Sequence, residues 1–183
     1  MFTSDKMERN VNVPEGVTIE IDRMKVTVKG PKGSLHKDFG SPLFGDMVRV
    51  EKNGQQIKVA TEGTKRKLKS EVGTVAAGIA NMVHGVTHGW KYKLKVVFLH
   101  FPVTVKIHGR EVLVSNFLGE KAPRKAEIVG ETKVELAGDE INISGIDLEA
   151  AGQTAANIER ATRIIARDRR VFMDGIFITE KPE

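Results

Sequence analysis

Apolar and polar residues alternate along several short stretches of this 183-residue chain. Such alternation is typical of strands that bury one face and expose the other. Two of the stretches, VTIEIDRMKVTVKGPKG (17–33) and VTVKIHGREVLVSNFLG (103–119), align without a gap and place their apolar residues at matching positions. Each contains a turn between two alternating runs. The pattern therefore predicts the same β-hairpin at two places in the chain.

The two hairpins belong to a longer internal repeat. VEKNGQQIKV (50–59) aligns with VELAGDEINI (134–143), and GTVAAGIANM (73–82) aligns with GQTAANIERA (152–161). The three matches follow one another in the same order, which indicates duplication of a unit of roughly 85 residues.

The third block of each repeat changes to a spacing of three and four residues, which is typical of an amphipathic helix. In the first repeat this spacing predicts a helix from about Lys65 to His84, where Gly85 ends it. In the second repeat it predicts a helix from about Asp147 to Ala166, with Ile165 on the inner face.

After each helix the chain returns to strand character, at residues 88–98 and 171–179. The expected fold class is α+β, with two tandem repeated domains, each an antiparallel β-sheet packed on one main α-helix. We place the domains at residues 1–97 and 98–183, and the sequence leaves open whether the first ten residues are ordered or form a flexible tail.

Composition narrows the class of protein. The chain has no cysteine, which excludes a disulfide framework and a thiolate metal site and suits a reducing compartment. It also lacks a run of about 18 apolar residues and a cleavable leader pattern. We therefore expect a soluble, cytoplasmic protein with no membrane partner.

The charge of the chain favours an anionic partner. The net charge is +5 and the sequence pI is about 9.4. The second domain is nevertheless slightly acidic, because residues 127–149 carry seven acidic side chains against Lys133 alone. Its positive charge must gather elsewhere, so we expect one acidic side and one arginine side.

Arginine is concentrated between residues 160 and 170, where only Asp168 opposes it. Three of the arginines (160, 163 and 167) should form an outward stripe on the predicted helix. The planar guanidinium group suits bidentate contact with phosphate, so this stretch is the main candidate for RNA binding. The candidate phosphate-contacting residues are Arg160, Arg163, Arg167, Arg169 and Arg170, with Lys181 assisting.

A second basic cluster opens the first predicted helix. Positive side chains oppose the helix dipole at this end, and a bound phosphate would relieve that repulsion. A series of solvent-exposed charged side chains without a ligand explains the cluster equally well, so a phosphate site and a plain charged surface both remain open. The residues are Lys65, Arg66, Lys67 and Lys69.

The chain offers little for catalysis or metal binding. His84 and His88 have the spacing of a zinc-binding pair, but Gly85 interrupts the helix between them and no third ligand stands nearby. There is no cysteine nucleophile and no Gly-x-Ser-x-Gly elbow. We therefore expect neither an enzyme, a metal, a cofactor nor a small-molecule substrate.

QTAANIERATRIIARDRRVFMDGIFITEK (153–181) resembles the C-terminal signature of the large-subunit ribosomal protein L6 family, in its archaeal and eukaryotic form. NMVHGVTHGWKYKL (81–94) and FPVTVKI (101–107) resemble two further segments of that family. Phe177 stands where the signature usually has tyrosine. In this resemblance Phe172, Asp174 and Gly175 shape the loop, and Asp174 is expected to brace backbone groups.

The resemblance implies a structural protein of the large ribosomal subunit that binds rRNA chiefly through its second domain. It also implies a position near the sarcin-ricin loop and the translation-factor site, with neighbouring ribosomal proteins as partners and translation factors nearby. The alternative is an RNA-binding regulatory module outside the ribosome.

Overall fold

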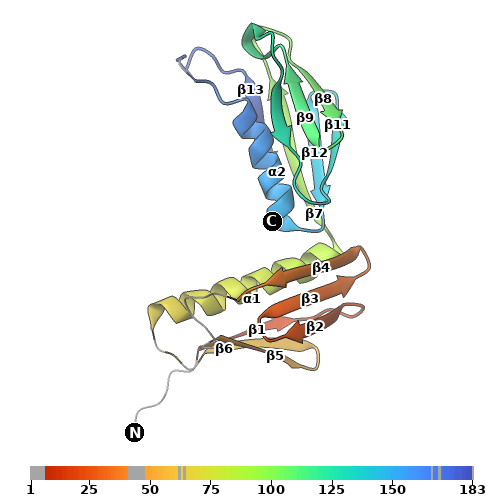
Figure 1. The fold of residues 1–183 in the computed structure, drawn as a ribbon, viewed down its shortest axis with the longest axis vertical. Helices are drawn as coiled ribbons and strands as arrows, with labels where there is room; N and C mark the ends of the chain where they lie inside the picture. The colour runs from red at the N-terminus through yellow and green to blue at the C-terminus, as the bar shows by residue number, and fades with distance from the viewer. Residues whose placement is uncertain are drawn as a thin grey trace. The chain divides into compact units, whose positions relative to one another are not determined.

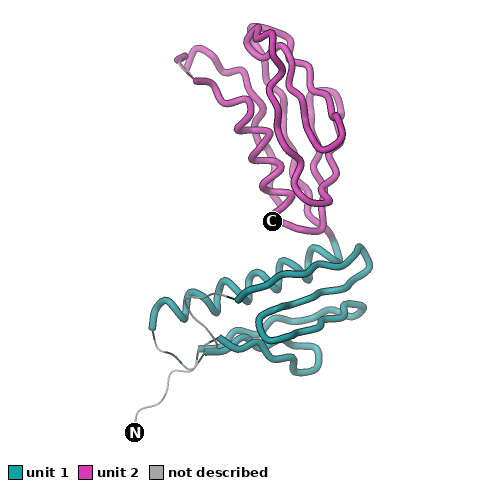
Figure 2. The backbone as a smooth tube through the Cα atoms, viewed as in Figure 1, with its two compact units in different colours: residues 1–88 teal, residues 89–183 magenta. Residues whose placement is uncertain are grey.

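The computed structural model describes residues 7–40, 48–61, 63, 65–165, 167–168 and 170–182. The chain divides into two compact units, Met1–His88 and Gly89–Glu183 (Figure 2). In each unit a long helix lies along one side of antiparallel strands (Figure 1). The predicted α+β class with two tandem repeated domains is confirmed.

Unit 1 contains two three-stranded sheets and one helix within its described residues. One sheet has the order β2 (Thr18–Asp22), β3 (Lys25–Gly30), β4 (Gly33–Asp38). The other has the order β1 (Met7–Asn12), β6 (Gln56–Thr61), β5 (Val48–Asn53). Helix α1 (Arg66–Thr87) buries its apolar stripe against them. The fully buried centre includes Val28, Ile57, Val59, Val72 and Ile79.

Unit 2 repeats this arrangement with one strand more. Its three-stranded sheet has the order β10 (Arg124–Glu127), β9 (Glu111–Ser115), β8 (Thr104–His108). Its four-stranded sheet has the order β11 (Lys133–Ala137), β12 (Glu140–Gly145), β7 (Trp90–Val97), β13 (Gly175–Glu180). Helix α2 (Leu148–Ala161) packs on these strands, and a short 3-10 helix η2 (Phe117–Gly119) joins β9 to β10.

The repeat found in the sequence is present in the fold. The paired stretches 17–33 and 103–119 contain β2–β3 and β8–β9, and the next pair contains β5–β6 and β11–β12. The order β1–β6–β5 in unit 1 corresponds to β7–β12–β11 in unit 2. Strand β13 is therefore an addition that pairs with the second side of β7.

The expected end of the first domain differs from the structure. Residues 90–97 were expected to close the first domain, but β7 pairs with β12 and β13, with Trp90 opposite Gly145 and Val97 opposite Gly175. Alternation identifies a strand but not the sheet that it joins. The sequence left the order of the first ten residues open, and in the structure residues 7–10 belong to β1 and pair with β6.

Both helices end at residues other than those predicted. Helix α1 continues through Gly85 to Thr87, and the N–H of His88 bonds to the carbonyl of His84 at 2.8 Å. Helix α2 ends at Ala161, so Arg163 and Arg167 lie in the following loop rather than on a helical stripe. Ile165 was expected inside but is 77% exposed, whereas Ile164 is buried.

Candidate nucleic-acid interface

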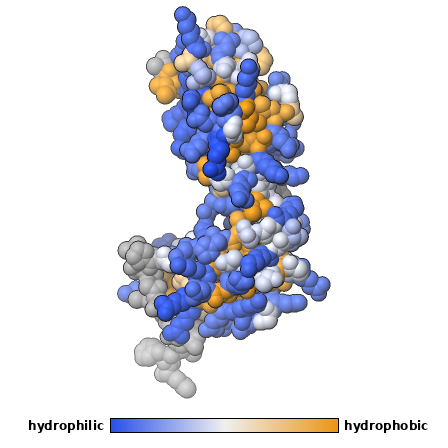
Figure 3. All heavy atoms as spheres, turned by 45° about the vertical axis from the view of Figure 1, so that its right-hand side comes forward, coloured by the Kyte–Doolittle hydropathy of each residue, from blue (hydrophilic) through white to orange (hydrophobic). Residues whose placement is uncertain are grey.

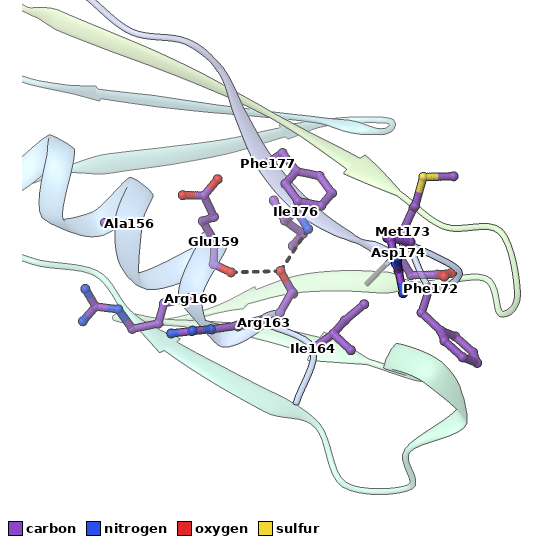
Figure 4. Close-up of a pocket in the computed structure, with 12 residues that line it drawn as sticks. Ala156, Glu159, Arg160, Arg163, Ile164, Phe172, Met173, Asp174, Ile176 and Phe177 are labelled. Atoms are coloured by element: carbon purple, nitrogen blue, oxygen red, sulfur yellow. Dashed lines mark hydrogen bonds between the residues drawn. The ribbon is translucent and has the colours of Figure 1, made fainter. Parts of the chain in front are cut away.

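The end of α2, the loop after it and the start of β13 surround a hollow of about 830 Å³ (Figure 4). Arg160, Arg163 and Arg170 contribute exposed side chains to its lining. Buried Ile164 and Ile176 contribute apolar surface. The hollow thus combines positive charge with a hydrophobic wall.

Glu159 of α2 and Thr162, the residue after its last turn, hold this helix against β13. The hydroxyl of Thr162 accepts a hydrogen bond from the N–H of Ile176 at 2.9 Å and donates one to the carbonyl of Glu159 at 3.1 Å (Figure 4). The Glu159 carboxylate accepts from the N–H of Ile178 at 3.3 Å. These bonds satisfy outward N–H groups that an edge strand would otherwise expose. They also fix Arg160 and Arg163 beside β13.

Arg124, on β10, anchors the same region from the other side. Its guanidinium group makes two hydrogen bonds to the Glu120 carboxylate, at 2.8 and 2.6 Å, and donates to the carbonyls of Ala161 and Arg163 at 3.0 Å each. The group also lies 4.5 Å from the centre of the Phe117 ring. The hydrogen bond from Arg124 lowers the pKa of Glu120. A cation at the helix C-terminus additionally complements the helix dipole.

Sequence reasoning missed Arg124, because it lies far from the arginine stretch along the chain and no motif marks it. We expect Arg124→Ala to lower the free energy of unfolding by about 2 kcal/mol, since the carbonyls of Ala161 and Arg163 and the Glu120 carboxylate lose their donor. Urea denaturation would measure this loss.

The matched control is Lys125→Ala. Lys125 is the neighbour of Arg124 on β10, and its replacement removes an exposed ion pair with Glu111. That change should cost less than about 0.5 kcal/mol. Equal losses in the two variants would contradict the anchoring role of Arg124.

A buried carboxylate ties the segment before β13 to the loop after β7. Asp174 is 2% exposed and accepts hydrogen bonds from the backbone N–H groups of Leu99 and His100, at 2.7 and 3.1 Å. Its other oxygen lies 2.7 Å from Nδ1 of His100. The His100 ring stacks on Phe172, and the Arg167 guanidinium lies 4.9 Å from the centre of the Phe172 ring. The loop around Asp174 thereby positions Arg167.

The pKa of Asp174 reflects opposing influences. Burial raises it, but the hydrogen bonds from the Leu99 N–H and from the His100 side chain and N–H lower it, and the net pKa lies below the usual value. Asp174 is therefore a carboxylate at neutral pH, and in that form it can accept all three bonds.

Arg170 is engaged by its neighbour Asp168. Nε and Nη2 of Arg170 lie 3.2 and 3.0 Å from the two Asp168 carboxylate oxygens, and the Arg170 N–H bonds to the same group at 3.0 Å. The Arg170 side chain is 90% exposed. The hydrogen bond from this side chain lowers the pKa of Asp168. A phosphate at Arg170 would compete with Asp168, so Arg170 offers a weaker contact than an unopposed arginine.

The remaining predicted RNA contacts are distributed as follows. Arg169 lies outside the described residues, and Lys181 is exposed just after β13. The second cluster lies at the start of α1 in unit 1, where Lys65, Arg66 and Lys67 are exposed and Lys69 is half-buried. The first turn of α1 has no acidic residue, and its N-cap residue makes no side-chain hydrogen bond.

The two histidines at the end of α1 contact each other. The rings of His84 and His88 stack with their centres 4.8 Å apart. Burial is the main cause that lowers the pKa of His84, and the charges of His88 and Lys32 add to it. Within the described ranges, no three His, Cys, Asp or Glu side chains are placed to hold a metal ion. No helix in that part of the chain is long and apolar enough to cross a membrane.

Comparison with known proteins agrees with the repeat and with the signature. A family model described as Ribosomal protein L6 matches residues 13–89 and 101–175. The chain belongs to the ribosomal protein L6 family. Its two matched ranges correspond to the two units of the fold.

Individual relatives match the L6 chain over nearly its full length. A protein of Ignicoccus hospitalis is 52% identical, with 92% of this chain and 91% of the relative covered. A relative from Desulfurococcus amylolyticus is 50% identical, with 94% of this chain and 94% of the relative covered. A relative from Natronomonas pharaonis is 41% identical, with 97% of this chain and 98% of the relative covered. All three are named "Large ribosomal subunit protein uL6". The resemblance noted in the sequence is confirmed, and so is the expectation of a structural rather than enzymatic protein.

Proposed function

We propose that this L6 chain is a structural component of the large ribosomal subunit and binds rRNA through unit 2. The contact region, here called the arginine surface, consists of Arg160, Arg163, Arg167 and Arg170 with Lys181. Arg169 is included in the proposal from its sequence position alone. As an L6 protein, the chain belongs to the cytoplasmic ribosome.

The observation that carries this proposal is the rigid support beneath the exposed arginines. Thr162, Glu159 and Arg124 fix the end of α2, and Phe172 positions the Arg167 guanidinium. A preorganised guanidinium loses less conformational freedom when it binds phosphate, so each contact is worth more. Phosphate contacts of this kind supply a large share of the affinity in protein–nucleic acid complexes.

The finer placement near the sarcin-ricin loop and the translation-factor site is supported by the family resemblance. Neighbouring ribosomal proteins are proposed partners, and translation factors are proposed to act nearby. The lysine-rich start of α1 is included as a second phosphate contact in unit 1, because most of its basic side chains are exposed and its first turn has no acidic residue.

Sedimentation of native large subunits through a high-salt wash tests the proposed function. A structural component should remain with the subunit, because many simultaneous contacts must break before it leaves. A regulatory RNA-binding module outside the ribosome should instead appear in the supernatant, and that result would contradict the proposal.

A further inference from the structure

We propose that the hollow between α2 and β13 receives one unstacked base of the rRNA, which packs on the ring of Phe177. The arginines around the hollow then hold the phosphates on either side of that nucleotide. This inference rests on the proposed rRNA-binding function and adds to it a specific recognition pocket.

The backbone of β13 leaves room for the Phe177 ring at a place where a base can stack on it. On β13 it shares a face with Gly175, two residues earlier. A Cβ atom built on Gly175 would lie only 2.9 Å from Cζ and 3.1 Å from Cε2 of the Phe177 ring. The end of the ring therefore lies directly over the glycine, in space that any other residue would occupy. The side chain remains 40% exposed and lines the hollow.

The hydrophobic surface around Phe177 fits a base. Met173 is 54% exposed and lines the same hollow, and the buried side chains of Ile164 and Ile176 complete its apolar wall. On the face drawn in Figure 3, apolar patches lie among hydrophilic side chains. Aromatic stacking with a base tolerates any base identity, because every base has a π face.

The charged side chains around the hollow determine which part of a nucleotide fits inside it. Glu159 lines the hollow, and its carboxylate would repel a phosphate placed inside. One of its oxygens accepts from the Ile178 N–H, and a carboxylate retains further acceptor capacity for an exocyclic amino group. Arg160 and Arg163 are exposed at the same hollow and suit the flanking phosphates. This arrangement favours a base inside and phosphates outside.

A hydrophobic segment of a protein is the competing occupant. The three arginines that line the hollow favour a nucleotide, because a protein side chain would bring no phosphate to neutralise them.

The test uses the full-length protein and a transcript of the large-subunit rRNA region that it binds. Phe177→Ala and Phe177→Leu both remove the aromatic face, and Phe177→Leu preserves most of the apolar volume. Phe177→Tyr is the matched control, because it keeps the ring. Affinity is measured at several salt concentrations, and thermal denaturation confirms that each variant is folded.

Loss of the ring should weaken rRNA binding about ten-fold in both variants, since base–aromatic stacking has that magnitude. The dependence of affinity on salt should not change, because no phosphate contact is removed. Phe177→Tyr should bind as tightly as the wild type.

Other outcomes separate the base pocket from the underlying function. Normal binding by Phe177→Ala and Phe177→Leu, with weakened binding by arginine variants, would overturn the pocket and leave the rRNA function intact. Normal binding by all of these variants would contradict the proposed arginine surface as well. If Phe177→Ala and Phe177→Leu bind the transcript normally but are retained less well in whole subunits, the hollow contacts a protein neighbour, and the base pocket is overturned.

Discussion

Replacing Asp174 with alanine should lower the free energy of unfolding by about 2–3 kcal/mol. The change leaves the backbone N–H groups of Leu99 and His100 without their acceptor, and each such loss costs on the order of 1–3 kcal/mol when water cannot replace it fully. It also frees the loop after β7 from the segment before β13. Urea denaturation of the full chain would measure the loss.

Asp174→Asn is the informative control, because it keeps one carbonyl acceptor in nearly the same shape. Its loss of stability should be smaller than that of Asp174→Ala. If both variants are as stable as the wild type, the Asp174 contacts do not hold the two segments together.

The same carboxylate predicts how stability changes with pH. Because its pKa in the folded protein lies below the ordinary value near 3.8, its contribution is fully present above that value. The contribution is lost as the pH falls through the folded pKa. Unfolding midpoints at pH 6 and pH 3 should therefore differ more for the wild type than for Asp174→Asn. An equal difference would contradict the assignment.

Changing Arg160 and Arg163 together to glutamine should weaken binding to the rRNA transcript on the order of 10- to 100-fold at moderate salt. Both side chains are exposed beside β13, so the substitutions remove charge without removing core packing. The slope of log affinity against log salt should fall by about 1.4–1.8, which corresponds to two lost phosphate contacts.

A double variant with the same loss of charge provides the control. Lys106 lies on β8, and Lys133 lies on β11, at the opposite edge of the four-stranded sheet from β13. Changing both to glutamine should leave affinity and salt slope close to those of the wild type. Equal effects in the two double variants would show that net charge, rather than the arginine surface, determines binding.

The alternation of apolar residues was sufficient to predict most strands, because each strand buries one face within its own unit. It could not assign β7 to a sheet, since the pairing of Trp90 with Gly145 depends on residues far along the chain. The end of α2 was missed for a similar reason. Thr162 is buried there and bonds to Ile176 of β13, a tertiary contact that overrides the helical periodicity continuing to Ile165.

The candidate site also contains some residues that the sequence identifies and others that only tertiary contacts reveal. The arginines stood out because charge density is a local property of the sequence. Arg124 did not, because its importance comes from the groups that it contacts in the folded chain. The role of Gly175 beneath the Phe177 ring likewise becomes visible only when the strand is built.

Crosslinking of RNA to protein in intact large subunits, mapped to single residues, would show directly which surface of unit 2 contacts rRNA. Crosslinks in unit 2 should concentrate at the arginine surface and at Phe177. Few crosslinks should fall in the acidic stretch 127–149. Crosslinks that concentrate in that stretch and spare Arg160, Arg163 and Arg167 would contradict rRNA binding through the arginine surface.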